Sequence, residues 1–312
     1  MRIGARSYKK VPGNREEGSF NKVRQEAKYK TIREFNEAKE YKVRVLCEIL
    51  SIPHSSYYKW LKRTETSDEI LNKEITNLII KLHDKHKGIL GYRQMTLWIN
   101  KELGSNYNIK PIRRLMKLVG VSSLIRRKRK GYKKHIPEQV GENILNREFK
   151  AEKPNEKWLT YVTEFKVSGT TTKLYLSAII DLFDNSVVAH KLGTSNNNPL
   201  VFETYDLAIL NNPDAKPIFH SDRGYQYTSR TFKHKLDIQG SIQSMSRVGR
   251  CIDNGPMEGF FGIIKSEMYY LNKYNDIEVL KNDIDNYINF YNNGRYQTKL
   301  KGLSPIEYRK QA

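Results

Sequence analysis

The stretch KWLTYVTEFKVSGTTTKLYLSAIIDLFDNSVVAHKL, residues 157–192, decides the fold that the sequence predicts. Apolar and polar residues alternate over Trp158–Val167, Lys173–Asp181 is a nearly continuous apolar run, and Ser186–Leu192 follows as a third segment. Alternation with a period of two is typical of a half-buried strand, and a continuous apolar run is typical of a central one. We therefore expect three antiparallel strands here.

Downstream of these strands the pattern alternates between helix and strand. The predicted helices are Asn198–Leu210, Ser229–Gln239 and Pro256–Tyr269, and the predicted strands are Pro217–His220 and Ile242–Met245. Three antiparallel strands followed by alternating helices and strands make a mixed sheet with helices on both faces. The fold class is α/β, in the ribonuclease H-like order, and all-α helix-turn-helix domains precede it.

The first helix-turn-helix is predicted over residues 31–63, after a basic, poorly ordered tail at residues 1–30. Val43, Leu46 and Leu50 indicate a helix, Ser51–Pro53 breaks it, and Ser55 is expected to cap a second helix. An ordinary helical hairpin would give the same pattern, so the pattern alone leaves both open.

A second helix-turn-helix-like domain is predicted over residues 64–125. It contains an apolar stripe from Ile70 to Leu82, a helix at Tyr92–Glu102 and another at Ile109–Val119, which Gly120 ends. The last helix turns three cations outward, where they would reach phosphates or guanine edges. They are Arg113, Arg114 and Lys117.

The formal net charge of +21 lies almost entirely in the first half. Residues 1–150 hold 35 Lys and Arg against 16 Asp and Glu, a net of +19, whereas residues 151–312 hold 20 against 18, a net of +2. Such a field favours polyanions, although a merely solvated surface is the alternative. Residues 126–150 are predicted to be a basic linker along DNA. Its densest cations are Arg126, Arg127, Lys128, Arg129 and Lys130.

The compartment predicted from composition is the cytoplasm. Two cysteines, Cys47 and Cys251, are too few for a disulfide framework. The apolar runs are short of a bilayer span, and the first residues lack a signal-peptide pattern. No membrane partner is expected.

Two acidic residues are placed to act together. Asp222 follows the strand that ends at His220, and Glu258 lies in the first turn of the helix after Asp253-Asn254-Gly255-Pro256, with 35 residues between the two acids. Converging carboxylates are hard oxygen ligands suited to Mg²⁺ or Mn²⁺. In a two-metal site one ion activates the attacking oxygen and the other stabilises the leaving oxygen at phosphorus.

Several motifs together resemble the second-reading-frame (OrfB-type) transposases of bacterial insertion sequences, which are relatives of retroviral integrases. These motifs are Lys87–Arg93 (KGILGYR), Lys157–Phe165 (KWLTYVTEF), Tyr175–Asp184 (YLSAIIDLFD), His220–Tyr227 (HSDRGYQY), Ser244–Glu258 (SMSRVGRCIDNGPME), Phe260–Glu267 (FFGIIKSE) and Phe290–Arg309. The resemblance spans about residues 40 to 310. It implies a catalytic core at residues 151–270, a C-terminal helical segment at residues 271–312, and DNA contacts by Arg93 and Lys265.

The resemblance also implies a catalytic triad of Asp, Asp and Glu, in which Asp222 is the second member and Glu258 the third. The first belongs three residues after Trp158, where this chain has Tyr161. A phenol is neutral at pH 7 and offers no charge to a metal ion. Glu164 should lie on the opposite face of the strand, and Asp181 matches a structural position. We expect cleavage to be absent or severely impaired.

Three functions are compatible with these features. The chain is an active transposase, a catalytically inactive remnant that still binds element ends, or a host DNA-binding regulator with a borrowed fold. The resemblance implies insertion-sequence ends and target DNA as partners, a homo-oligomer on nucleoid DNA, and fusion or pairing with an upstream-frame protein. His220 and Arg223 would touch phosphates or brace their loop. Asn254 and Ser304 are expected to cap helices.

Overall fold

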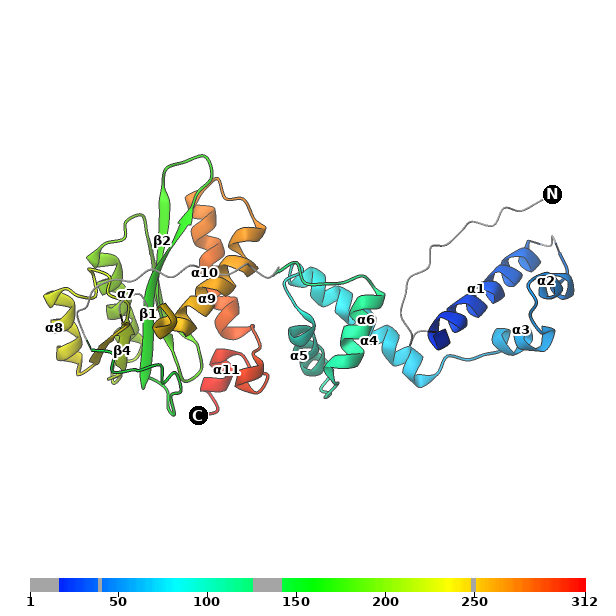
Figure 1. Cartoon of the computed structure of the whole chain (residues 1–312), viewed down its shortest axis with the longest axis horizontal. Coiled ribbons are helices and arrows are strands. Elements are labelled where there is room, and N and C mark those ends of the chain that lie inside the picture. The colour runs from blue at the N-terminus through cyan, green and yellow to red at the C-terminus, as the bar shows by residue number, and fades with distance from the viewer. Residues whose placement is uncertain (1–16, 39–40, 126–141, 248–250) are drawn as a thin grey trace. The chain divides into compact units, whose positions relative to one another are not determined.

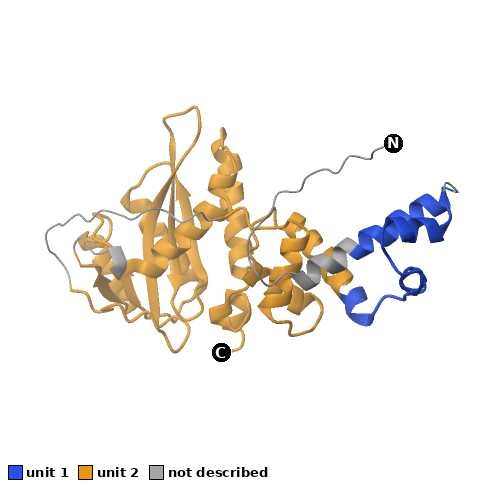
Figure 2. Ribbon diagram, turned by 45° about the vertical axis from the view of Figure 1, so that its right-hand side comes forward, with its two compact units in different colours: residues 1–71 blue, residues 72–312 orange. Residues whose placement is uncertain are grey.

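The computed structural model describes residues 17–38, 41–125, 142–247 and 251–312. The chain divides into two compact units, residues 1–71 and residues 72–312, which Figure 2 colours separately. Within the described residues no helix is both long enough and apolar enough to cross a membrane.

Unit 1 contains the helices α1 (Glu17–Glu37), α2 (Val43–Ile49) and α3 (His54–Leu61). Its core joins Ile32 of α1 to Leu46 and Cys47 of α2 and to Tyr57 of α3. The predicted helix, break and helix over residues 43–61 are confirmed.

The predicted tail at residues 1–30 is wrong over residues 17–30, which are helical. The helix lacks a broad apolar stripe and is stabilised instead by charged pairs one turn apart, Lys30 with Glu26 and Arg33 with Glu37. Residues 1–16 lie outside the described residues. The predicted cap Ser55 is wrong as well: α3 begins at His54, and Pro53 holds the N-cap position without a side-chain hydrogen bond.

The next helices are α4 (Ser67–Lys85), α5 (Tyr92–Glu102) and α6 (Ile109–Leu118). The predicted apolar stripe is buried at Ile75, Ile79 and Leu82, whereas Ile70 is exposed. Asn108 caps α6, and Gly120, with a φ of 71°, follows its end as predicted because a left-handed residue there favours glycine.

The second half is built on a five-stranded mixed sheet, ordered β3-β2-β1-β4-β5 in the described part of the chain. The strands are β1 (Lys157–Lys166), β2 (Lys173–Asp181), β3 (Val187–Gly193), β4 (Ile218–Ser221) and β5 (Ile242–Met245). β1 to β3 form an antiparallel meander, while β4 runs parallel to β1, and β5 runs parallel to β4. This is the ribonuclease H-like arrangement that the sequence predicts.

Helices cover both faces of the sheet (Figure 1). α7 (Asn198–Asn211) and α8 (Arg230–Gln239) pack on one face around Trp158 and Phe219. α9 (Gly255–Glu267) and α10 (Ile277–Asn293) pack on the other face around Leu159. Because the apolar residues of α10 belong to the same cluster as those of α9, the predicted boundary after residue 270 does not separate two bodies.

The predicted linker at residues 126–150 is wrong over its second part. Residues 126–141 lie outside the described residues, but residues 142–150 pack on the domain that contains the five-stranded sheet. Leu145 is buried, and Lys157 of β1 donates to the carbonyls of Glu148 and Lys150 at 3.3 and 2.7 Å. Burial of Leu145 and these hydrogen bonds to β1 therefore hold this segment in place.

The C-terminal segment contains the short helical turns η2 (Tyr269–Leu271) and η3 (Thr298–Leu300) and ends with α11 (Pro305–Arg309), whose predicted capping box of Ser304 and Glu307 is confirmed. Arg309 reaches the buried carboxylates of Asp181 and Asp184, both at 2.8 Å. The segment also packs on α5, where the Trp98 and Tyr296 rings are 4.5 Å apart between centroids.

Candidate active site

Asp222 lies one residue beyond the end of β4, at the edge of the sheet where β4 runs beside β1. Its Oδ1 accepts a hydrogen bond from the backbone N–H of Gly224 at 2.9 Å. Burial raises the pKa of Asp222, and the Gly224 hydrogen bond acts in the opposite direction. A side chain at position 224 would place its Cβ 2.8 Å from Gln226 Oε1 and 3.1 Å from Asp222 Oδ1, so a larger residue there would displace the Gln226 amide and crowd the Asp222 carboxylate.

His220, two residues before Asp222, braces this loop. It is fully buried, and its Nδ1 and Nε2 lie 2.9 and 3.0 Å from the hydroxyls of Ser244 and Ser246. Burial lowers the pKa of His220 to about 4. Arg223 donates to the Ser246 carbonyl at 2.8 Å. Of the two roles open for His220 and Arg223, these contacts favour bracing.

Glu258 lies in the first turn of α9 and is exposed, whereas Met257 and Phe261 beside it on the helix are buried. The preceding 3₁₀ turn η1 (Cys251–Asn254) fixes where α9 begins. The predicted cap by Asn254 is wrong, because its side chain makes no cap bond and donates instead to the Thr160 carbonyl of β1 at 3.0 Å. This bond ties the start of α9 to the residue before Tyr161.

Tyr161 lies on the face of β1 that α9 covers. Its ring packs at 6.0 Å from that of Phe261, and its strand neighbours Leu159 and Phe165 belong to the same cluster. The β1–β4 register pairs Leu159 with His220. Two residues further along each chain, Tyr161 therefore stands at the level of Asp222.

Neither Glu164 nor Asp181, the two acids nearest to Tyr161 in the sequence argument, is placed to act in its stead. Glu164 lies on the opposite face of β1, as predicted, and pairs with Lys173 at 2.9 Å. Asp181 is the last residue of β2, pairs with Trp158 of β1 and is fully buried. It accepts hydrogen bonds from Arg309 and from the N–H groups of Asn155 and Phe183. Its contacts match the structural role expected of it.

Lys265 lies two turns after Glu258 and is half-buried. Its Nζ donates to Thr163 Oγ1 at 2.6 Å and lies 5.3 Å from the centre of the Phe165 ring. Desolvation lowers the pKa of Lys265. The ammonium group is thus held on the same face of β1 as Tyr161, next to the carboxylate site, rather than on an open surface.

The residues present do not fit a complete two-metal centre. Asp222 and Glu258 are carboxylates of the kind that Mg²⁺ or Mn²⁺ prefers, but Tyr161 supplies a neutral phenol where a third carboxylate is needed. Among the described residues, no group of three or more His, Cys, Asp or Glu side chains is placed to hold a metal ion.

Two of the predicted DNA-binding cations of the second helix-turn-helix lie over the same aromatic ring. The Arg93 and Arg113 guanidiniums lie 5.8 and 5.3 Å from the centre of the Tyr92 ring. Arg93, Arg113, Arg114 and Lys117 are all exposed. The cations at residues 126–130 lie outside the described residues.

Two features of the site escaped prediction. Tyr227 is buried beside it, with its hydroxyl 3.2 Å from Thr160 Oγ1; burial raises its pKa, and so do the nearby Asp222 and Tyr161. Asp253 is buried between two arginines. The only sequence signal for the Asp253 cluster was an acidic residue shortly before Glu258.

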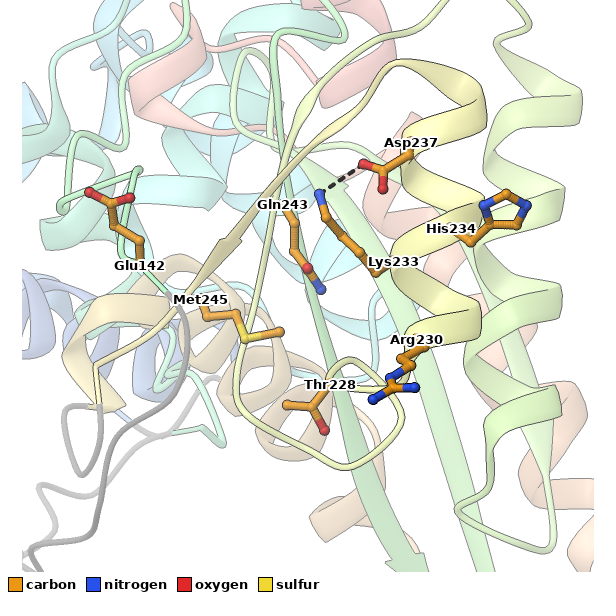
Figure 3. A pocket seen from close by; sticks show the side chains of 8 residues that line it. All are labelled: Glu142, Thr228, Arg230, Lys233, His234, Asp237, Gln243 and Met245. Carbon is orange, nitrogen blue, oxygen red and sulfur yellow. Dashed lines mark hydrogen bonds and ion pairs between the residues drawn. The ribbon is translucent and has the colours of Figure 1, made fainter.

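A surface pocket of about 400 Å³ lies between α8 and β5 (Figure 3). Its lining includes Arg230, Lys233 and Gln243, and Lys233 pairs with Asp237 at 2.8 Å. The pocket includes neither Asp222 nor Glu258, so it is separate from the candidate site.

Known families match most of the second unit. Residues 151–251 and 258–312 match the integrase core domain, and residues 71–129 match an HTH-like domain. The fold and the Asp222/Glu258 pair thus define a protein with an integrase core and a helix-turn-helix-like domain.

Relatives narrow this class. The chain is 40% identical over 273 residues to InsK of insertion sequence element IS150 from Escherichia coli (strain K12), covering 87% of this chain and 94% of InsK. It is 41% identical over 206 residues to a transposase-like protein of Haemophilus influenzae, covering 66% and 94%, and 25% identical over 276 residues to the transposase InsF of IS3A from E. coli, covering 86% and 94%. The chain belongs to the family of insertion-sequence transposases.

Solved structures with similar folds include integrases. The HTLV-2 integrase catalytic core domain in complex with magnesium is 21% identical with a TM-score of 0.39, covering 50% of this chain and 97% of that one. The simian T-cell lymphotropic virus intasome is 16% identical with a TM-score of 0.44, covering 74% of each chain. The family assignment rests on the sequence relatives, not on these likenesses.

Proposed function

We propose that this chain binds the ends of its insertion sequence and target DNA as a transposase, but is severely impaired in cutting and joining them. The observation that carries the proposal is the phenol of Tyr161 at the level of Asp222, on the face that α9 covers. An aspartate in its place would complete a set of three carboxylates for Mg²⁺ or Mn²⁺ and DNA phosphoryl transfer.

The missing carboxylate is the dominant defect because the rest of the site is intact. Asp222 is held by Gly224, the start of α9 is tied to β1 through Asn254, and Lys265 is held by Thr163. The scaffold that would position an aspartate at 161 is therefore retained. The chain behaves as an end-binding transposase in which one substitution disables the chemistry.

DNA binding is proposed to begin at the helix-turn-helix-like domain. Arg93 and Arg113 flank the Tyr92 ring, and Arg114 and Lys117 extend the same helix, α6. Guanidiniums fixed in this way can donate to phosphates or to guanine edges. Arg126, Arg127, Lys128, Arg129 and Lys130 are proposed to add phosphate contacts.

The setting is proposed from the family. The chain acts in the bacterial cytoplasm on nucleoid DNA, as a homo-oligomer, since two element ends must be joined to one target. Fusion or pairing with an upstream-frame protein would add further DNA contacts. The assignment of domains is proposed likewise: DNA recognition by the helices up to residue 125, and chemistry by residues 151–270.

Manganese titration tests the disabled site directly. Calorimetry of the full chain should give little heat with Mn²⁺, and Tyr161→Asp should bind Mn²⁺ at least about tenfold more tightly because a third carboxylate joins the set. Tyr161→Asn is the matched control, since asparagine has the shape of aspartate without its negative charge. Equal Mn²⁺ affinity for the unchanged chain and Tyr161→Asp would refute the proposal.

Footprinting on the element's inverted repeats separates the alternatives. Retained end binding predicts the same protected bases for the unchanged chain and for Tyr161→Asp. A host regulator would show no preference for the repeats over unrelated DNA, and that result would remove end binding from the proposal.

A further inference from the structure

Two arginines from distant segments meet on one buried carboxylate. Asp253 of η1 has a fully buried side chain. Its Oδ1 accepts from Arg147 Nε at 2.6 Å and Arg247 Nη2 at 2.9 Å, and its Oδ2 accepts from Arg247 Nε at 2.8 Å. The Arg247 backbone N–H and Asn143 Nδ2 also donate to Oδ2, at 3.0 and 3.1 Å. The carboxylate is thus saturated.

The cluster retains one positive charge and spare donors. Two guanidiniums and one carboxylate leave a net charge of +1, and each guanidinium carries five N–H donors. Both arginine side chains are 39% exposed. Within the described residues, neither guanidinium has a hydrogen-bond partner other than Asp253. One arginine would suffice to compensate Asp253, so the second is unexplained by packing alone.

The backbone is shaped to bring Arg147 to Asp253. Asn146 and Arg147 both have left-handed φ angles, 43° and 66°, a backbone conformation that is unfavourable for residues with a Cβ. Asn143 holds this turn, because its Oδ1 accepts from the Asn146 N–H at 2.8 Å while its Nδ2 reaches Asp253. This unfavourable backbone turn therefore places the Arg147 guanidinium against Asp253.

The cluster lies beside the Asp222/Glu258 site. Arg247 follows Ser246, whose N–H donates to the Ser221 carbonyl just before Asp222. Asp253 precedes Asn254, which bonds to the Thr160 carbonyl of β1, and Glu258 follows one turn later in α9. The segment that carries Asp222 and the helix that carries Glu258 are therefore both linked to the two arginines.

We propose that Arg147 and Arg247, oriented by Asp253, bind a backbone phosphate of the DNA that enters the Asp222/Glu258 site. This inference rests on the proposed function, since it names a DNA contact of that same site. Charge-assisted N–H···O bonds from two guanidiniums held in advance suit a phosphate, which presents several anionic oxygens. A phosphate contact carries no base preference, so it should act on any duplex.

The test is fluorescence anisotropy of the full chain with two labelled duplexes, one carrying an element end and one of unrelated sequence. The double variant Arg147→Gln/Arg247→Gln should lower the affinity for both duplexes by about tenfold or more, and reduce the slope of log K against log salt by about one. Lys281→Gln, which removes a partly exposed cation of α10, is the matched control. Equal affinity and slope in the double variant and the control would overturn the proposal.

The effect of Asp253→Asn on DNA affinity should be opposite to the effect expected from net charge alone. Removing a negative charge should strengthen DNA binding, but the proposal predicts weaker binding, because the guanidiniums lose the carboxylate that orients them. Asp285→Asn on α10 is the control for charge alone. Stronger binding by a folded Asp253→Asn would contradict the proposal, and if that variant unfolds, the arginine variant decides. Failure of the proposed function is distinguishable, since it would appear as no preference of the unchanged chain for the element end.

Discussion

Tyr161 of β1 and Asp222 beyond β4 stand at the same level on two neighbouring parallel strands. The β1–β4 register pairs Lys157 with Ile218 and Leu159 with His220, a constant offset of 61 residues, and 222 − 161 is also 61. A side chain at position 161 therefore lies at the level of Asp222, on the face of β1 that α9 covers. Two carboxylates there could share a cation, whereas a phenol and a carboxylate cannot bind it with comparable strength.

DNA affinity should depend on Arg113. Replacing Arg113 with Gln removes a guanidinium that stacks on Tyr92 from α6. If it contacts a phosphate, the slope of log K against log salt falls by about one on every duplex; if it contacts a guanine edge, affinity falls mainly on the element end, by about tenfold or more. Anisotropy measures both, with exposed Lys299→Gln as the control. No change in either quantity would remove Arg113 from the interface.

Stability should fall on acidification through His220. Burial lowers its pKa from 6.5 to about 4 in the folded chain, so between these values the unfolded chain binds a proton that the folded chain does not. Stability is then greatest above pH 6.5 and decreases by about 2 kcal/mol from this group between pH 7.5 and 5. Urea unfolding of His220→Gln should show a shallower pH dependence over that range. The exposed His234→Gln should keep the original slope, and a His220→Gln slope equal to it would contradict the assignment.

Replacing Arg309 of α11 while its two buried acidic partners remain should greatly lower the free energy of unfolding. Arg309 bonds to Asp181 and Asp184, which are both fully buried. Arg309→Met leaves two carboxylates without their cation, and removing one partner of a buried network costs about 3–5 kcal/mol. Equilibrium unfolding measures the loss, with the neighbouring exposed Lys310→Met as control. A loss below about 1 kcal/mol would show that other groups compensate the two acids.

The contact of α5 with the C-terminal segment should give a measurable coupling energy. The Trp98 and Tyr296 rings pack at 4.5 Å, and Lys101 lies 4.3 Å over the Tyr296 ring and pairs with Glu307. In a double-mutant cycle of Trp98→Leu and Tyr296→Leu, the aromatic pair should give about 0.5–1.5 kcal/mol beyond the two single effects. Additive losses would mean that the rings do not stabilise each other.

The sheet was predictable because its strands carry strong local patterns. β2 and β5 begin and end where the sequence predicts, whereas β1, β3 and β4 are each shifted by one residue at both ends. Their order follows from the antiparallel meander of β1–β3 and from the alternating elements after it. Helix α1 was missed since its stability comes from charged pairs and from Tyr29 and Ile32 packing on distant residues, which no local stripe reveals.

The site was predictable only as a set of residue types. The spacing of Asp222 and Glu258 and the tyrosine at position 161 are visible in the sequence. The sequence does not show that Tyr161 of β1 and Asp222 after β4 lie at the same level of the sheet. The sequence also could not assign Asn254, whose amide serves β1 rather than the cap of α9, or Asp253, whose partners are 106 and 6 residues away. Such contacts depend on tertiary packing, which fixes side chains that local pattern leaves free.

The most direct measurement is a strand-transfer assay with the element's own ends, comparing the unchanged chain with Tyr161→Asp in Mg²⁺ and in Mn²⁺. Tyr161→Asp is expected to give joined product at a rate about a thousandfold or more above the unchanged chain, since several kcal/mol of transition-state stabilisation depend on the third carboxylate. Tyr161→Asn should remain as slow as the unchanged chain. Equal rates for the unchanged chain and Tyr161→Asp would contradict the claim that Tyr161 disables this transposase.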